Sequence, residues 1–172
     1  MRILVLNGSP RAKGNTAAHV AAFAEGARAA GHTVDVVEVC KKKIAGCLAC
    51  EYCHTKGGGK CIQQDDMQAV YPLVEEAEMI VLASPIYYFS FTGQLQSALN
   101  RIYALVRPKN LKKSALFLSA ASPEAFDGAI LSYRLSFPGY LKTEDMGVFT
   151  AAGDENQSPE LLEKLRAFGK SL

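Results

Sequence analysis

The sequence predicts an α/β fold in which a doubly wound, five-stranded parallel sheet carries helices on both faces. Short continuous apolar runs, the first at residues 3–6, indicate strands that are buried on both sides. These runs alternate along the chain with longer segments whose apolar residues recur at helical spacing. The first forty residues form a β-α-β unit, and such a unit joins two parallel strands by a right-handed crossover.

The predicted elements alternate regularly. Strands are expected at residues 3–6, 33–39, 79–83, 115–118 and 145–151. Helices are expected to begin near residues 15, 65, 92, 124 and 158. Residues 40–64 lack periodicity and hold all five cysteines, so we expect a long functional loop there.

Polar residues mark the beginning of several helices. Asp65 is expected to cap the second helix, with Gln68 placed to close a capping box. Thr92 is expected to cap the third helix. Ser158 is expected to cap the last helix, with Pro159 at its first position.

Length and composition indicate one ordinary globular domain over residues 1–172. Apolar residues make up 49% of the chain and charged residues 21%. The net charge of +2 is too small to argue for nucleic acid or a membrane surface as a partner. No apolar stretch approaches the roughly 20 residues of a membrane helix, and the run at residues 3–6 is too short for a signal peptide. We therefore expect a cytoplasmic protein.

A phosphate-binding segment is predicted directly after the first strand. In an open α/β sheet, ligands bind at the carboxyl ends of the strands, near the topological switch point. Glycines permit close backbone approach there, and the following helix offers free N–H groups. Hydroxyl, amide and cationic side chains complete a site for a phosphate monoester. The candidate residues are Ser9, Arg11, Lys13, Gly14, Asn15 and Thr16.

The same segment does not match two common phosphate motifs. A Walker A loop has four residues between its glycines, followed by Lys and then Ser or Thr. Here five residues separate Gly8 from Gly14, and Asn15 and Thr16 follow. The segment also lacks the Gly-x-Gly-x-x-Gly pattern of a dinucleotide site. We therefore expect a monophosphate ligand.

A second ligand-contacting loop is predicted after the third strand, at the same edge of the sheet. Flat aromatic side chains suit a planar heterocycle, and loop N–H groups can bond to its polar edge. Alternatively, these aromatic residues pack beneath the loop or at a subunit contact. Residues 119–122, after the fourth strand, are a third candidate wall. The candidate residues of the second loop are Ser84, Pro85, Ile86, Tyr87, Tyr88 and Phe89.

These segments resemble the NADPH-dependent FMN reductase and iron–sulfur flavoprotein branch of the flavodoxin superfamily. The resemblance covers most of the chain and rests on Gly8-Ser9-Pro10-Arg11, Gly14-Asn15-Thr16, Ser84-Pro85-Ile86-Tyr87 and Gly93-Gln94-Leu95. It implies a flavodoxin-like strand order 2-1-3-4-5, FMN as the cofactor and NAD(P)H as an electron donor. It also implies that Ser9, Arg11, Asn15 and Thr16 hold the FMN phosphate and that residues 85–89 line the isoalloxazine. Such proteins are often dimers or tetramers, so we expect a homo-oligomer.

Four of the five cysteines form a compact motif, Cys47-x₂-Cys50-x₂-Cys53-x₇-Cys61. Thiolates at this spacing can hold a 4Fe-4S cluster, and iron–sulfur flavoproteins carry this kind of motif. A structural zinc ion, redox-active thiols and simple loop packing are the alternatives. Cys40 stands apart at the end of the second strand and is expected to be a buried core thiol.

The resulting hypothesis is an FMN-dependent oxidoreductase. Electrons would pass from NAD(P)H or a protein donor to a flavin, a quinone or a similar acceptor, so the partner is a small redox substrate or an electron-transfer protein. The sequence contains no catalytic triad, carboxylate pair or histidine metal motif, and a flavin carries the reactive atoms itself. One alternative is an iron–sulfur flavoprotein acting in electron transfer. The other is a non-enzymatic zinc-binding module on the same scaffold.

Overall fold

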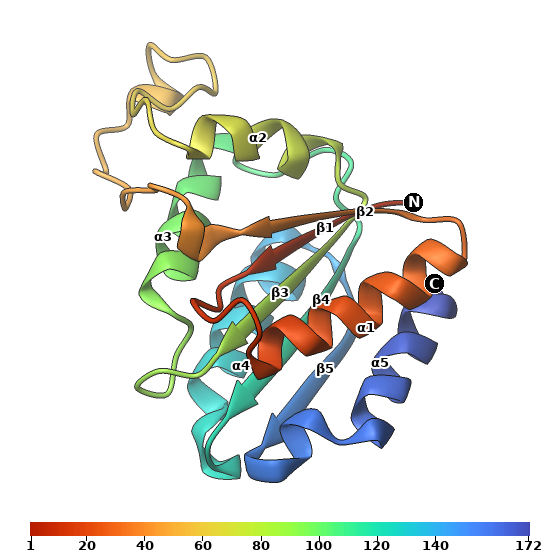
Figure 1. Cartoon of the computed structure of the whole chain (residues 1–172). Helices are drawn as coiled ribbons and strands as arrows, with labels where there is room; N and C mark the ends of the chain where they lie inside the picture. Colours follow the sequence, from red (N-terminus) through yellow and green to blue (C-terminus); the bar gives the residue numbers. More distant parts are fainter.

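The computed structural model describes residues 1–172 and contains a five-stranded sheet in which all strands are parallel. Its strands are β1 (Arg2–Asn7), β2 (Thr33–Glu38), β3 (Met79–Pro85), β4 (Lys113–Ala120) and β5 (Glu144–Ala152). They are arranged in the order β2-β1-β3-β4-β5 (Figure 1). The predicted flavodoxin-like fold class and its strand order are confirmed.

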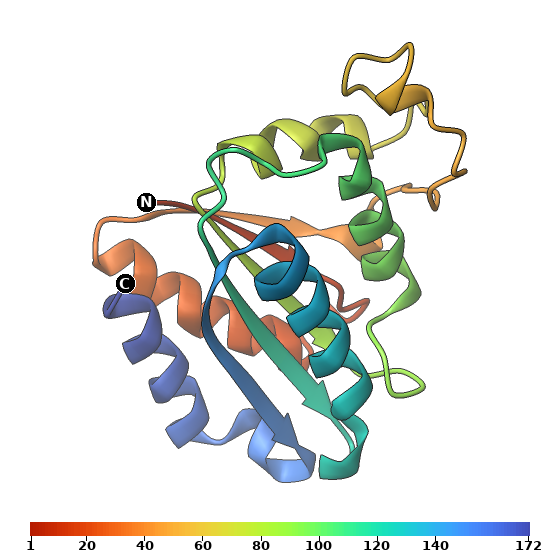
Figure 2. The same cartoon turned by 180° about the vertical axis from the view of Figure 1, so that it is seen from behind.

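Five α-helices cover the two faces of the sheet. They are α1 (Asn15–Ala29), α2 (Met67–Glu76), α3 (Gly93–Ile102), α4 (Asp127–Arg134) and α5 (Pro159–Lys170). Helices α1 and α5 lie on one face, whereas α2, α3 and α4 lie on the other (Figures 1 and 2). None of the helices combines the length and the apolar character needed to cross a bilayer.

The core consists of two apolar layers, one on each side of the sheet. On the α1–α5 side, Phe23 packs edge-to-face against Phe117, with ring centroids 5.2 Å apart. Helices α1 and α5 approach closely, because a Cβ on Gly26 would lie 1.9 Å from the Arg166 carbonyl oxygen. This contact fixes α1, whose N-terminus follows the predicted phosphate segment.

Two of the predicted helix caps are confirmed. Thr92 accepts a bond from the Leu95 N–H at 3.4 Å and caps α3. Ser158 accepts a bond from the Leu161 N–H at 3.2 Å and caps α5, with Pro159 at the first position.

The capping box predicted for α2 is wrong. Asp66 precedes the helix, and no side chain caps it in the usual way. The Asp65 carboxylate accepts a bond from the Met67 N–H but is mainly paired with Arg101. The Gln68 amide donates to two carbonyls of the cysteine-rich segment. Tertiary contacts therefore replace the capping box, although Asp65 still accepts the Met67 N–H at the beginning of α2.

The helix predicted over residues 124–137 is divided into three parts. A short 3₁₀ turn, Pro123–Ala125, precedes α4, and a π-helical turn, Leu135–Leu141, follows it. Pro138 lies inside that turn. Proline has no N–H to donate to the carbonyl four residues earlier, which accounts for the departure from α-helical bonding.

The carboxyl ends of the strands meet at one edge of the sheet. Strand β1 lies between β2 and β3, and the helix after β1 covers one face while the helix after β3 covers the other (Figures 1 and 2). The two connecting loops therefore diverge at the topological switch point and leave a crevice between them.

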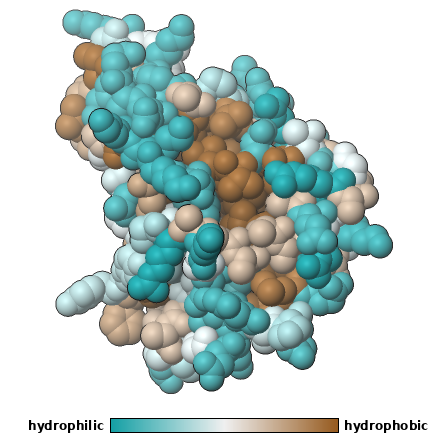
Figure 3. Space-filling view, in the orientation of Figure 1, coloured by the Kyte–Doolittle hydropathy of each residue, from teal (hydrophilic) through white to brown (hydrophobic).

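The cysteine segment, residues 40–64, projects from the sheet beside α2 and α3 (Figures 1 and 2). Its regular structure is limited to two short 3₁₀ turns, Val39–Lys41 and Tyr52–His54. In the space-filling view this segment forms a largely hydrophilic lobe, and apolar surface gathers over the sheet between the lobe and α1 (Figure 3). The expected long loop is thus observed.

Candidate functional site

The segment after β1 forms a compact turn held by its own polar groups. The Ser9 N–H donates to the Asn7 side chain at 2.9 Å. The Arg11 N–H donates to Ser9 Oγ at 3.2 Å, and the Gly14 N–H donates to the Arg11 carbonyl at 3.1 Å. These bonds close residues 8–14, the phosphate turn, in front of α1.

Gly8 lies where the phosphate turn meets α3. A Cβ there would lie 2.8 Å from Thr92 Oγ1 and 2.9 Å from Leu95 Cβ, so a larger residue does not fit. The Gly8 carbonyl accepts bonds from Thr92 Oγ1 and from Cys40 Sγ, both at 2.8 Å. Cys40 is half-buried, and burial raises the pKa of its thiol. The expectation that Cys40 is a buried core thiol is therefore wrong, because the side chain is only half-buried and bonds to the phosphate turn.

The N-terminus of α1 is open beside this turn. Gly14 precedes the helix, and no side chain caps it. The unpaired N–H groups of the first helical turn and the positive end of the helix dipole are therefore available to an anion. Thr16 is buried and bonds through Oγ1 to Ser119 Oγ at 2.8 Å. That bond joins the beginning of α1 to the end of β4.

The loop after β3 contains a tight hairpin. Tyr87 and Ser90 exchange backbone hydrogen bonds of 3.0 and 3.1 Å. Between them, Tyr88 and Phe89 have φ values of 49° and 61°. Two-residue turns with positive φ favour Asn-Gly, so two aromatic residues here impose backbone strain. Tyr88 is 100% exposed and Phe89 is 64% exposed.

Loops at the carboxyl edge enclose one cavity of about 360 Å³, the cofactor cavity. Its walls are Ser9, Arg11, Gly14, Asn15, Thr16, Pro85, Ile86, Tyr87, Ser119, Ala120, Ala121, Gly153 and Asn156. The structure thus brings together most of the residues predicted to contact the phosphate, half of those predicted after β3, and the third candidate wall after β4.

Four predicted residues do not line this cavity. Lys13 is exposed, and Tyr88 and Phe89 form the exposed hairpin tip. Ser84 is fully buried, and its Oγ accepts a bond from the Thr92 N–H at 3.2 Å. Ser84 therefore ties the loop after β3 to the beginning of α3.

Sequence reasoning missed Asn156, in the turn after β5. Its Nδ2 donates to the carbonyls of Ala120 and Gly153 at 2.9 and 2.8 Å, and its own carbonyl accepts a bond from His19 at 2.7 Å. Its buried Oδ1 has no hydrogen-bond partner in the protein. Such an acceptor is costly unless a donor reaches it. The position of this turn beyond the end of a strand was the available signal.

The residues of the cofactor cavity fit FMN. The hydroxyls of Ser9 and Thr16, the Arg11 guanidinium and the open end of α1 suit a phosphate dianion. The segment at residues 85–87 offers apolar and aromatic walls to a planar ring. The free oxygen of Asn156 suits a ligand N–H or O–H donor.

The four motif cysteines line a second, much smaller cavity of about 20 Å³, the cysteine cavity. Cys47 and Cys50 are exposed, Cys53 and Cys61 are half-buried, and none forms a disulfide. Burial raises the pKa of the Cys53 thiol. No three histidine, cysteine or acidic side chains are arranged to hold a metal ion in this conformation. The donor set therefore fits a thiophilic metal or a cluster, but its sulfurs do not form a ready ligand shell.

A buried ion pair lies at the base of the cysteine segment. Arg101 on α3 is 1% exposed and holds Asp65 through both terminal nitrogens, at 2.6 and 3.2 Å. Burial alone would raise the pKa of Asp65, but hydrogen bonds from Arg101 and from two backbone N–H groups bring it below its usual value. Sequence reasoning missed this pair, although an arginine within the apolar stripe of α3 was a signal.

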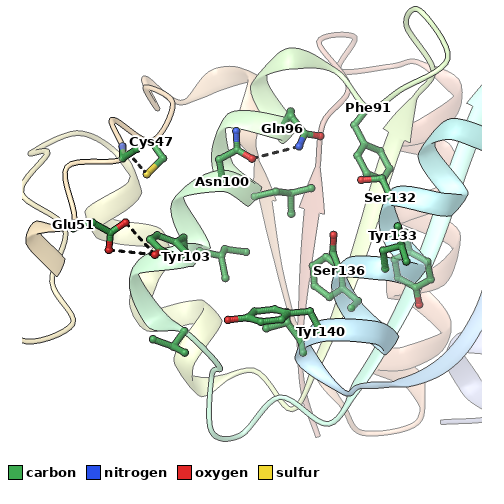
Figure 4. A pocket seen from close by; sticks show the side chains of 17 residues that line it. Cys47, Glu51, Phe91, Gln96, Asn100, Tyr103, Ser132, Tyr133, Ser136 and Tyr140 are labelled. Atoms are coloured by element: carbon green, nitrogen blue, oxygen red, sulfur yellow. Dashed lines mark hydrogen bonds between the residues drawn. The ribbon is translucent and has the colours of Figure 1, made fainter. Parts of the chain in front are cut away.

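A larger groove of about 560 Å³, the α3–α4 groove, lies between these helices and the cysteine segment (Figure 4). Most of its lining is apolar. At one end the Tyr103 hydroxyl donates to both carboxylate oxygens of Glu51, at 3.1 and 3.2 Å. Leu135, from the π-helical turn, is 64% exposed at its rim. The groove shares no lining residue with the cofactor cavity, so it is a separate surface.

Sequence comparison relates the chain to flavin enzymes. Residues 1–157 match the family model of NADPH-dependent FMN reductases. An iron-sulfur flavoprotein of Archaeoglobus fulgidus is 36% identical over 102 residues, which cover 59% of this chain and 46% of that protein. An iron-sulfur flavoprotein of Methanocaldococcus jannaschii is 35% identical over 114 residues, or 65% of this chain and 57% of that protein. The chain thus spans about half the length of these curated relatives.

Solved structures share the fold. An NAD(P)H:quinone oxidoreductase from Methanothermobacter marburgensis aligns with a TM-score of 0.73 over 99% of this chain and 96% of that chain, at 18% identity. An azoreductase from Bacillus anthracis aligns with a TM-score of 0.66 over 99% and 95%, at 17% identity. Since the family model covers nearly the whole chain, the protein belongs to the NADPH-dependent FMN reductase family.

Proposed function

We propose that the protein is an FMN-dependent oxidoreductase that takes electrons from NAD(P)H or a protein donor and passes them to a flavin, a quinone or a similar acceptor. The cofactor cavity carries this proposal, because it joins an anion-binding turn to an apolar wall at the topological switch point. Membership of the FMN reductase family supports it.

Each part of the cavity has a task in this proposal. Ser9, Arg11, Asn15 and Thr16 bind the phosphate together with the N–H groups of α1. Residues 85–87 line the ring and exclude water from one side of it. Bound FMN supplies the hydride and single-electron chemistry, while the protein provides position and electrostatics.

A matched pair of substitutions tests the phosphate site. Arg11→Ala removes a cation that lines the cavity, whereas Lys13→Ala removes an exposed cation of the same turn that does not line it. Loss of a hydrogen bond to a charged group predicts about 10- to 100-fold weaker FMN binding for Arg11→Ala. Quenching of flavin fluorescence measures the affinity, and Lys13→Ala should change it much less. Wild-type affinity in Arg11→Ala would remove Arg11 from the site.

The electron donor is tested separately. Anaerobic FMN-loaded protein is mixed with NADH or NADPH, and bleaching of the flavin absorbance reports reduction. Bleaching by either nucleotide, at least as fast as the steady-state turnover of the enzyme, supports the reductase proposal. Bleaching only by a reduced ferredoxin-type protein would assign the chain to electron transfer between proteins.

A second candidate function is that of an iron–sulfur flavoprotein with a 4Fe-4S cluster on the Cys47–Cys61 motif. The common cavity of Cys47, Cys50, Cys53 and Cys61 favours it, and curated relatives carry the name iron-sulfur flavoprotein. Visible spectra and metal analysis of anaerobically purified protein decide the question. Brown protein with FMN and about four irons per chain supports the cluster. Yellow protein without iron supports the simple reductase, and colourless zinc protein that does not take up FMN would contradict both.

We further propose a homo-oligomer, either a dimer or a tetramer. The α3–α4 groove supports this proposal, because an apolar groove with exposed apolar side chains is typical of an interaction surface. Leu135 and Tyr140, which line it, are 64% and 51% exposed. Light scattering measures the assembly, and Leu135→Glu should shift it toward the monomer. A wild-type protein that is monomeric at high concentration would contradict the proposal.

We also propose that residues 1–172 are one domain and that the protein is cytoplasmic. The continuous sheet with helices on both faces supports one domain. Five unpaired cysteines suit a reducing compartment. Limited proteolysis and cell fractionation test the two proposals.

A further inference from the structure

We propose that Arg101 gathers the two ends of the cysteine motif and offers an unpaired N–H donor to its four thiols. This inference rests on the proposed thiolate site and identifies the residue that prepares it. Arg101 and all four cysteines line the same cavity of about 20 Å³. A buried cation from α3 is therefore part of the wall that the thiols share.

Arg101 ties the two ends of the cysteine segment together. Its Nη1 donates to the Ala45 carbonyl at 3.0 Å, just before Cys47. Nη1 and Nη2 also hold the carboxylate of Asp65, just after the motif, at 2.6 and 3.2 Å. Asp65 in turn accepts a bond from the Ala45 N–H at 3.0 Å. One guanidinium thus closes the loop that runs from residue 46 to residue 64.

Other bonds to the segment come from residues after the motif, namely between Lys43 and Asp66 and from Gln68 to the carbonyls of Cys61 and Gln63. The segment contains no strand or α-helix, and Cys47 and Cys50 are exposed. Tyr103, which follows α3, adds two ties: its hydroxyl pairs with Glu51, and its ring packs edge-to-face against His54. Closing a loop at its base reduces the ordering cost when its side chains converge on a ligand. Arg101 is therefore positioned to hold the two ends of the motif, so that less ordering remains when the thiols converge on a metal.

The free Nε gives Arg101 a second task, because the charge of the guanidinium is already compensated by Asp65. Four thiolates around a divalent metal or a cluster carry net negative charge, which hydrogen-bond donors beside the sulfurs stabilise. Arg101 is 1% exposed, and its Nε has no hydrogen-bond partner in the protein. A buried N–H without an acceptor is itself costly. The sulfurs lining the same cavity are suitable acceptors, and hydrogen bonds to sulfur stabilise metal–thiolate centres.

Three variants separate these tasks from a general effect on folding. Arg101→Met removes the charge and the planar fork, whereas Arg101→Lys keeps the charge but not the paired hydrogen bonds. Arg166→Met is the control, because Arg166 is a partly exposed arginine of α5 that pairs with Glu25 and Glu163. FMN affinity is measured in every variant and reports whether the cofactor cavity has kept its fold.

The experiment titrates FMN-loaded, reduced, full-length protein with Co²⁺ under anaerobic conditions. Tetrahedral thiolate coordination gives intense d–d bands at wavelengths longer than flavin absorbs. We expect wild type and Arg166→Met to bind Co²⁺ equally. Substitution of a residue that supports metal ligands typically weakens binding about 10- to 100-fold. We expect a loss of this size in Arg101→Met, partial rescue in Arg101→Lys, and unchanged FMN affinity throughout. Equal Co²⁺ affinity in wild type and Arg101→Met would overturn the inference.

Hydrogen exchange of the metal-free protein separates this inference from the proposed metal site. Faster exchange over residues 46–64 in Arg101→Met, with the remaining chain unchanged, supports the gathering role even if wild type binds no Co²⁺. In that case the proposed metal site alone fails. Unchanged exchange would overturn the gathering role. If Arg101→Met also loses FMN, Arg101→Lys is the deciding variant. Wild-type Co²⁺ affinity and wild-type hydrogen exchange in Arg101→Lys would show that the paired hydrogen bonds of the guanidinium are not needed, and would overturn the inference.

Discussion

Two loops of this protein, the phosphate turn at residues 8–14 and the cysteine segment at residues 40–64, are held in place in different ways. Backbone bonds and neutral side chains fix the phosphate turn, as in the bond from the Ser9 N–H to Asn7. The base of the cysteine segment depends on charged groups, because Arg101 and Asp65 form a buried ion pair there and the Asp66 carboxylate accepts a bond from the Lys43 N–H. Both loops follow neighbouring strands, β1 and β2, and Cys40 links them by its bond to the Gly8 carbonyl.

The phosphate turn is therefore preorganised, whereas the conformation of the cysteine segment depends more strongly on a buried ion pair. Many short neutral contacts make the phosphate turn insensitive to pH and to the loss of any one contact. The buried ion pair is the strongest contact of the cysteine segment, and removal of one partner leaves an uncompensated charge. The cofactor cavity is therefore expected to persist under conditions in which the cysteine segment has already loosened.

The largest expected effect comes from unpairing the buried arginine. Asp65→Ala leaves Arg101 buried without its carboxylate and should cost about 3–5 kcal/mol of unfolding free energy. Asn7→Ala, which removes one neutral bond of the phosphate turn, should cost about 1 kcal/mol. Urea unfolding monitored by circular dichroism gives both values. Similar losses in the two variants would contradict the comparison.

A glycine in each loop tests how tightly the two loops are packed. Gly8→Ala places a Cβ within 3 Å of Thr92 and Leu95 and should cost about 1–3 kcal/mol through overpacking. It should also weaken FMN retention. Gly46→Ala is the matched control, because a Cβ at that position meets no atom within 4 Å. Equal thermal stability of the two variants would show that the phosphate turn adapts more easily than its packing indicates.

The phosphate turn was predictable because its signals are local. Glycines, hydroxyls and a following helix lie within one short stretch of sequence, and the rule for parallel sheets places that stretch at the ligand edge. The strands could be located because buried strands appear as continuous apolar runs. Their order agreed with the one that the family resemblance implied.

The remaining features depend on residues far apart in the chain. Arg101 meets Asp65 across 36 positions, and His19 meets Asn156 across 137. Local preference predicted Asp65 as a helix cap, but the buried cation competes for the same carboxylate and forms the stronger bond. No spacing rule connects such partners. The Arg101–Asp65 pair and the place of Asn156 in the cofactor cavity could therefore be found only from the structure.

Lowering the pH should loosen the cysteine segment before the phosphate turn, with a smaller loss of stability than the substitutions cause. Hydrogen bonds from Arg101 lower the pKa of Asp65 in the folded protein despite its burial. The unfolded chain therefore binds the proton first as pH falls, and the pair's contribution is complete above the unfolded pKa, about 3.9. It is lost as pH falls below that value toward the lower folded pKa. Protection factors, which correct for the slower intrinsic amide exchange in acid, should fall in residues 46–64 before residues 8–14 as pH decreases. Simultaneous loosening of both loops would contradict this order.

The smallest expected effect concerns backbone strain, which occurs on both sides of the comparison. Ala49 and Glu51 in the cysteine segment have positive φ values, as do Tyr88 and Phe89 beside the cofactor cavity. Replacing Tyr88-Phe89 by Asn-Gly supplies the residues that this turn favours, and should raise stability by about 1 kcal/mol. Ala49→Gly should raise it less, because glycine also gains entropy in the unfolded chain. Thermal unfolding measures both changes. A gain in stability accompanied by slower flavin reduction would show that Tyr88 and Phe89 serve the reaction. An unchanged rate of flavin reduction would favour the alternative that these two residues contact another subunit.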